Sequence, residues 1–292
     1  MRLLPWLPAA KDPVDDLAVV KALTGAALLR TTWHLPPGDV LEREAVVLER
    51  LGHTSAKRLS ARQYEALRAV ALASLAGWTL GCDHWAVRVL ANASSLAVHG
   101  QNAALLPESW NYASHLHFFL VLLTLFPVGE RTTPDSAAVL LEALQLCYAW
   151  AYLQAGASKL RNTGVRWADG RTLRASWAES RSPLGEWLGR RDLRWASAAS
   201  TAALVLELGF VPALLVPGPH RRLLGLASLA FHGSTKATLG ISFWHFSWYA
   251  VPLFGLPESV SGPVARLAAH ARRVATSRPC ANSDSVRMRL MC

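Results

Sequence analysis

The chain has 292 residues, of which 52% are hydrophobic and only 17% are charged, and its formal net charge is +10. A soluble globular domain usually carries about 25% charged residues, so this composition argues against one, and apolar stretches near the roughly 17–25 residues that cross a bilayer recur from end to end. The arginines gather in the connections between these stretches, which is typical of membrane topology set by positive loops and argues against a nucleic-acid partner.

The first half of the chain begins with a tail at 1–15 and a first apolar segment at about 16–33, which Lys21 interrupts. A charged stretch at 34–62 follows, and it suits a connection that contains a short amphipathic helix. Further membrane segments are expected at 64–82, 84–106 and 113–128.

The second half begins with a long helix that we expect at 136–160. The region 161–195 then differs in kind, because it carries eight arginines and because Trp167, Trp177 and Trp187 are spaced ten apart in it. Arginine and tryptophan on a mixed segment favour a helix that lies in the headgroup layer of a membrane. Nucleic-acid binding is the alternative for this region, and we favour the membrane-surface helix over it.

Membrane segments resume after this region, at 196–216, 222–240 and 241–256. The sequence therefore predicts an all-α fold, a polytopic transmembrane helical bundle of about seven or eight spans that occupies residues 16–258. The basic, serine-rich tail at 259–292 is expected to be disordered. We expect a multi-pass protein of a cell membrane, which we take to be bacterial, with membrane lipid as a partner.

Ionisable side chains inside the predicted spans are costly and ask for an explanation. Five stand out: His115, Glu142, Lys159, Glu207 and His232. Lys159 ends the 136–160 helix, and it either extends its ammonium to the membrane surface or points into the bundle. In the bundle it would lose water, which favours a neutral amine that can act as a base. Glu207 is the better candidate for its partner, because Glu142 is seventeen residues away on the same helix.

The histidines have spacings that argue against a metal site, and we expect none. His115 and His117 are two residues apart and point to different faces of a helix. His232 and Lys236 have the i, i+4 spacing that puts them on one face. Because a protonated lysine is a poor metal ligand, this second pair suits a proton relay or an anion site better than a metal.

Five stretches of the sequence resemble segments of one protein family, and they follow one another in the same order as in that family. "YLQAGASKLRNTGVRWADG" at 152–170 is similar to the AG-x-x-KL…W-x-x-G signature of the vitamin K-dependent γ-glutamyl carboxylases and of the broader HTTM (horizontally transferred transmembrane) domain. The stretches 15–29, 109–126, 207–216 and 231–258 resemble further membrane segments of that family. The resemblance covers about residues 14–258.

The resemblance implies a quinol chemistry and a set of site residues. In that family a membrane lysine deprotonates vitamin K hydroquinone, and O₂ and CO₂ are co-substrates in forming an epoxide and carboxylating a glutamate. The resemblance places the catalytic lysine at Lys159 and the catalytic histidines at His115 and His232, where they would stabilise an oxyanion. It places quinol-binding positions at Trp110 and at Ser114, where the family has asparagine. We expect Lys236, a charge that the family does not have at this position, to take part in quinol binding as well.

Two main readings of the function follow, and a transporter is a weaker third. The first is an enzyme that oxidises a quinol and carboxylates an unknown acceptor, expected to be small or lipid-borne because the family's large extramembrane substrate-binding domain has no counterpart in this sequence. The second is a non-catalytic membrane scaffold, or a lipid- or quinone-binding protein. The feature that distinguishes the enzyme from the scaffold is whether Lys159, His115 and His232 surround one cavity.

Overall fold

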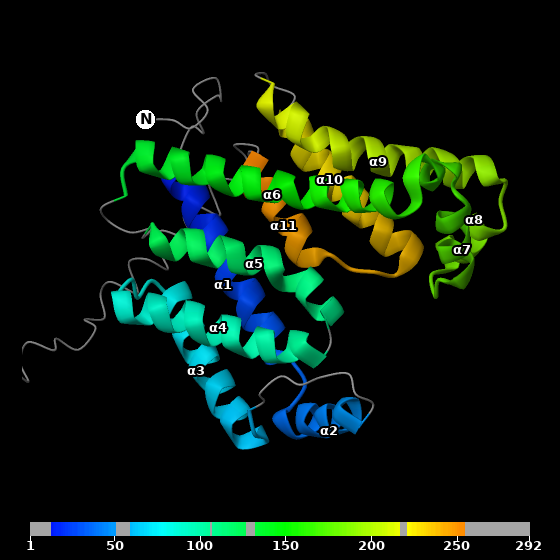
Figure 1. The fold of residues 1–292 in the computed structure, drawn as a ribbon. Helices are drawn as coiled ribbons and strands as arrows, with labels where there is room; N and C mark the ends of the chain where they lie inside the picture. The colour runs from blue at the N-terminus through cyan, green and yellow to red at the C-terminus, as the bar shows by residue number, and fades with distance from the viewer. Residues whose placement is uncertain (1–12, 51–58, 106, 127–131, 217–220, 255–292) are drawn as a thin grey trace, which may run out of the picture. The chain divides into compact units, whose positions relative to one another are not determined.

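A computed structural model describes residues 13–50, 59–105, 107–126, 132–216 and 221–254. Within these residues the regular structure consists of eleven α-helices and one short 3₁₀ helix, without strands (Figure 1). The predicted all-α class is therefore confirmed. Residues 1–12 and 259–292, which carry most of the two predicted tails, lie outside the described residues, and residues 13–15 already belong to the first helix.

Each of the eight predicted apolar segments coincides with one helix. These helices are α1 (Pro13–Trp33), α3 (Ala61–Thr79), α4 (Trp85–Leu105), α5 (Pro107–Leu125), α6 (Pro134–Thr163), α9 (Leu193–Leu215), α10 (Arg221–Leu239) and α11 (Trp244–Phe254). The short helix expected in the charged stretch is α2 (Gly38–Arg50).

Only two helical stretches of the described residues are both long and apolar enough to cross a membrane, Pro134–Asp169 and Leu193–Leu215. This is fewer than the seven or eight spans that the sequence predicts. Three of the other helices fall short for identifiable reasons. Charged side chains such as Glu65 and Arg68 dilute the apolar character of α3, Lys236 does so in α10, and α11 has only eleven residues.

Local sequence signals explain where the long helices begin. α3 opens with a capping box in which Ser60 and Gln63 satisfy each other's backbone N–H groups. α6 opens in the same way with Thr133 and Ser136, and Pro134 occupies a position where a helix needs no N–H donor. The Asp192 side chain accepts a hydrogen bond at the start of α9.

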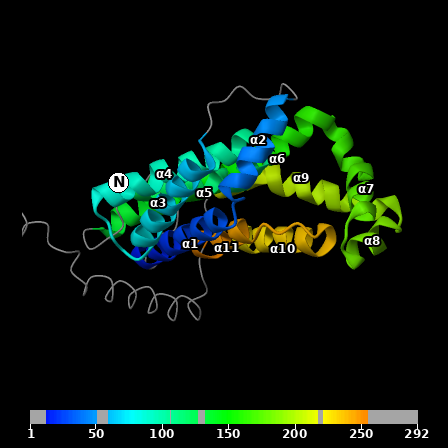
Figure 2. The ribbon, with the colours of Figure 1, turned by 90° about the horizontal axis from the view of Figure 1, so that it is seen from below.

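The helices divide into two compact units, and α1 contributes residues to both of them. Unit 2 holds residues 24–131 of the helical region, with α2 to α5. α4 packs against both α3 and α5, and α2 packs on α3 and α4 (Figures 1 and 2). Leu41, Tyr64, Ala71 and Val98 form an apolar core between α2, α3 and α4.

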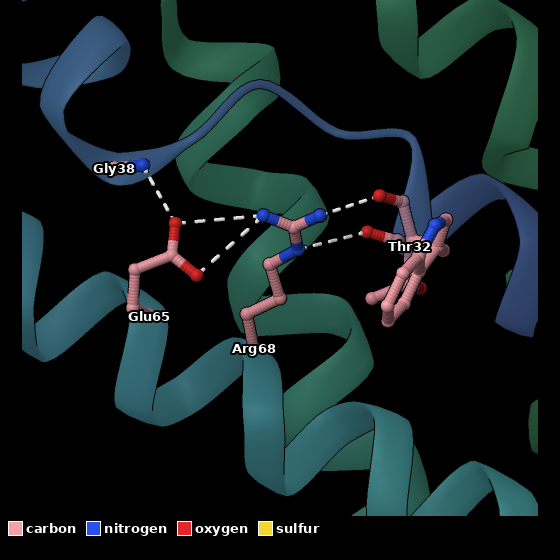
Figure 3. A network of polar contacts seen from close by, with 5 residues as sticks. Thr32, Gly38, Glu65 and Arg68 are labelled. Carbon is pink, nitrogen blue, oxygen red and sulfur yellow. Dashed lines mark hydrogen bonds and ion pairs between the residues drawn. The ribbon is translucent and has the colours of Figure 1, made fainter.

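The end of α1 in unit 2 is fixed by Arg68 of α3 (Figure 3). Its guanidinium donates to the main-chain oxygens of Thr32 and Trp33, where a helix leaves carbonyls without internal partners. Arg68 also contacts Glu65, which accepts a hydrogen bond from the backbone N–H of Gly38 at the start of α2. One arginine and one glutamate of α3 therefore hold the turn between α1 and α2.

Replacing Arg68 by methionine should lower the unfolding free energy of unit 2 by about 1–3 kcal/mol, because hydrogen bonds from a charged group to the end of α1 are lost. The measurement is the unfolding midpoint of the protein in detergent micelles. The control is Arg62→Met, since Arg62 lies exposed on the same helix. Equal midpoints for the two variants would contradict a structural role for the Arg68 contacts.

Unit 1 holds residues 132–257 and the first residues of α1. Within it α6 packs along α9, α10 packs against α11 and α9, and α11 also contacts α6. Figures 1 and 2 show α6 and α9 running side by side.

The predicted surface segment 161–195 forms three short elements of unit 1, the 3₁₀ helix η1 (Gly164–Asp169), α7 (Arg171–Glu179) and α8 (Pro183–Gly189). They pack on α9 and α10, so the segment neither spans as one helix nor hangs free. Its tryptophans differ in exposure: Trp187 is exposed, whereas Trp177 is buried inside the packed elements.

Candidate functional site

Unit 1 contains an ion pair between α6 and α9. Lys159 Nζ lies 2.6 Å from Glu207 Oε1 and 2.7 Å from Oε2. The Glu207 side chain is 3% exposed and that of Lys159 is 24% exposed. The Trp167 ring of η1 covers the ammonium, with its centroid 5.5 Å from Nζ. The expectation that Glu207 is the carboxylate partner of Lys159 is confirmed.

The ion pair exists because α6 and α9 approach closely at Gly156. A Cβ atom at this position would lie 2.9 Å from Leu208 Cδ2 and 3.0 Å from Glu207 Cβ. Gly156 lies one turn before Lys159, on the same side of α6. The glycine of the AG-x-x-KL stretch thus lets the backbone of α9 come near enough for Glu207 to meet the lysine.

Replacing Gly156 by alanine should lower the unfolding free energy by about 1–3 kcal/mol, because the added methyl pushes α9 away. The matched control is Gly209→Ala in α9, where a Cβ meets nothing within 4 Å. That control should gain about 0.5–1 kcal/mol, since alanine favours a helix over glycine. Unfolding midpoints in detergent test both, and a stabilised Gly156→Ala protein would rule out the close approach.

A second polar network lies on the same stripe of α6 as Lys159 and joins it to α10. Tyr148 and Tyr152 are spaced one turn apart, and both hydroxyls contact Ser228 Oγ, at 2.5 and 2.6 Å. The Tyr152 hydroxyl also lies 2.8 Å from His232 Nε2, and the Tyr148 hydroxyl donates to the carbonyl oxygen of Phe246 at 3.1 Å. All four side chains are buried.

The ion pair and this network are connected through α9. Phe210 stands one turn after Glu207 and stacks on Tyr152, with ring centroids 4.4 Å apart and planes 11° apart. Tyr152 and Lys159 are seven residues apart on α6, which is about 10 Å along the helix axis. Two of the predicted catalytic residues, Lys159 and His232, therefore belong to neighbouring networks of one unit.

Lys236 does not join His232 in the interior. His232 is buried, whereas Lys236 is exposed in the last turn of α10. The i, i+4 spacing put them on one face, but a cation in the last turn of a helix is favoured by water and by the partial negative charge of the helix end. Because one side chain is buried and the other is exposed, their burial does not support the predicted relay or anion site between them.

The remaining predicted residues belong to unit 2. His115 is buried in α5, Ser114 is half-buried beside it, and the side chain of Trp110 lies outside the described residues. His117, the neighbour expected on another face, is also buried; its Nε2 lies 3.2 Å from Ser95 Oγ and its ring is 4.7 Å from that of His99. That His115 joins Lys159 and His232 around one cavity stays a prediction.

The sequence reasoning missed Tyr148, Tyr152 and Ser228. A signal was available for the tyrosines, because hydroxyls at i and i+4 share the stripe of Lys159 on an otherwise apolar helix. Ser228 gave no such signal, since its partners are 76 and 80 positions away in the chain.

In the part of the chain that the structure describes, no cluster of three or more histidine, cysteine, aspartate or glutamate side chains has a geometry that could hold a metal ion. Comparison of the chain with protein-family models, with curated proteins and with solved structures gave no match.

Proposed function

We propose that the chain is a multi-pass membrane enzyme that binds a quinol beside Lys159 and Glu207 and oxidises it with O₂, with carboxylation of an acceptor by CO₂ as the coupled reaction. The observation that carries the proposal is the Lys159–Glu207 pair, in which a buried carboxylate meets a partly buried ammonium between the two helices that are long and apolar enough to cross a membrane. Ionisable groups held between such helices are functional candidates, because removing them from water is costly.

The distribution of side chains on unit 1 supports the membrane setting. Polar groups such as Ser200, Glu207 and Ser228 are buried, while large apolar side chains of the same helices are exposed, including Val205 at 65% and Leu226 at 62%. Exposed apolar side chains on helices with polar interiors are favoured where the surrounding solvent is lipid.

The ion pair offers a base without leaving a net charge in the bundle. Passing one proton from Lys159 Nζ to a Glu207 oxygen gives a neutral amine beside a neutral acid. The amine can then take the proton of a quinol hydroxyl, and the restored ammonium stabilises the anionic oxygen next to it. Overall, a quinol and O₂ give an epoxide and water, while the acceptor exchanges a C–H bond for a C–CO₂ bond and releases its proton.

The resemblance of 152–170 to the carboxylase signature adds to this proposal, because its lysine falls on the paired Lys159 and two of its glycines, Gly156 and Gly170, fall where α9 comes close to the chain. The second candidate is a non-catalytic scaffold. One observation favours the scaffold: Lys159 Nζ contacts both oxygens of Glu207, and an ion pair with this geometry can also serve as a purely structural link between α6 and α9.

The test is to incubate the purified protein in detergent with vitamin K hydroquinone and O₂ and to measure the epoxide by mass spectrometry. The proposal expects epoxide from the wild type and from Arg161→Ala, which removes an exposed cation two residues after Lys159. Absence of epoxide with vitamin K hydroquinone, ubiquinol and menaquinol alike would favour the scaffold.

A further inference from the structure

The buried hydrogen-bond chain from Phe246 to His232 has a direction that its end point determines. A carbonyl oxygen only accepts, so the Tyr148 hydroxyl donates its hydrogen to Phe246. Ser228 must then donate to Tyr148, because each hydroxyl has one hydrogen. By the same reasoning Tyr152 donates to Ser228, and His232 Nε2–H donates to Tyr152.

The opposite direction satisfies fewer contacts. If Tyr148 donated to Ser228, its oxygen would face the Phe246 carbonyl at 3.1 Å with lone pair against lone pair. A hydrogen bond that is left unmade costs more free energy when its donor and acceptor are buried than when water can reach them. All four contacts are made only when His232 carries its hydrogen on Nε2.

We infer that His232 is held as the Nε2–H tautomer and that its Nδ1 is the hydrogen-bond acceptor for a hydroxyl group of a small, largely apolar ligand. Nδ1 is buried, and among the described residues it has no hydrogen-bond partner. The ring is enclosed by aromatic neighbours, with centroids of Phe231, Phe243 and Phe246 at 5.2 to 5.4 Å. A buried acceptor in apolar surroundings selects a neutral donor such as a phenolic hydroxyl.

This assignment differs from an oxyanion-stabilising histidine, because Nδ1 in this tautomer has no hydrogen to give. It also makes Tyr148, Ser228 and Tyr152 positioning residues and not a proton path, since a chain that ends on a carbonyl has nowhere to deliver a proton. The assignment of the ligand hydroxyl to a quinol rests on the proposed function. The assignment of the tautomer is independent of it.

The direct test is nitrogen NMR of protein labelled in its histidines, with His232→Gln used to assign the signal. The wild type should show His232 as Nε2–H. Ser228→Ala removes the acceptor of the Tyr152 hydroxyl, which then donates to Nε2 and shifts the hydrogen to Nδ1. Ser200→Ala is the matched control, because Ser200 is equally buried in unit 1 but takes no part in the hydrogen-bond chain from His232 to Phe246. Tyr148→Phe, which keeps the ring, should give a mixture of both tautomers.

The ligand part is tested by anaerobic binding of menadiol, its dimethyl ether and menadione in detergent. The wild type and Ser200→Ala should bind menadiol about tenfold more tightly than the ether, the value of one well-made buried hydrogen bond. Ser228→Ala should lose this preference and gain affinity for menadione, whose carbonyls accept from Nδ1–H.

The outcomes separate this inference from the proposed function. A wild-type His232 with its hydrogen on Nδ1, or a tautomer unchanged in both Ser228→Ala and Tyr148→Phe, overturns the inference even if epoxide is formed. The expected tautomer without a preference for menadiol over its ether overturns the ligand assignment. The expected tautomer and preference in a protein that makes no epoxide support the inference, while the proposed catalysis fails.

Discussion

Replacing Lys159 by alanine is expected to lower the rate of quinol epoxidation by about 10²–10⁴-fold, the range for loss of a catalytic base. The same change leaves Glu207 buried without its ammonium. Breaking a buried pair from one side costs about 3–5 kcal/mol, and less where the carboxylate can neutralise itself by taking a proton. The single variant should therefore lose both activity and stability.

A double variant separates these two effects. Lys159→Ala with Glu207→Gln leaves no buried charge, so its unfolding midpoint should return toward that of the wild type, while epoxide formation stays lost. Epoxide by mass spectrometry and unfolding in detergent are the two measurements, with Arg161→Ala as the control. Wild-type epoxidation by a folded Lys159→Ala protein would show that the lysine only links α6 to α9.

Replacing Gly170 by alanine is expected to destabilise unit 1 by more than about 4 kcal/mol, the level reached by few single substitutions. Gly170 has φ +78°, and a Cβ there would lie 2.2 Å from Ser197 N and 2.4 Å from the Ala196 carbonyl carbon. Backbone atoms cannot move aside as a side-chain tip can, so η1 would have to leave α9.

Gly240→Ala provides the comparison, because Gly240 has nearly the same φ, +73°, but nothing within 4 Å of the added Cβ. It should cost only the backbone strain, about 1–2 kcal/mol. Yield of folded protein and unfolding midpoint are the readouts. Similar losses for the two variants would mean that φ alone, and not the contact of η1 with α9, explains the requirement for glycine.

The positions of the helices were predictable, because apolar runs and turn residues are local signals. Lys159 could be matched with Glu207 by excluding Glu142, since a straight helix keeps residues seventeen apart from meeting. The number of membrane spans was not confirmed, because charges on α3 and α10 weaken the apolar signal of these helices and α11 is short.

What the sequence could not provide were the contacts that depend on packing between distant segments. The hydrogen bonds of Ser228 to Tyr148 and Tyr152 arise only once α10 lies near α6. The burial of Trp177 follows in the same way from the packing of η1, α7 and α8 on unit 1 and not from its place in the spacing of tryptophans.

Under the proposed function, the length of α6 sets the depth of the ion pair in the bilayer. Thirty residues make a helix about 45 Å long, whereas the hydrocarbon core of a bilayer is about 30 Å thick. An upright α6 would project into a headgroup layer, and Lys159, four residues before its end, would lie in the boundary between acyl chains and headgroups. A quinol anchored by its isoprenoid tail could then present its ring at this level by lateral diffusion, without leaving the lipid.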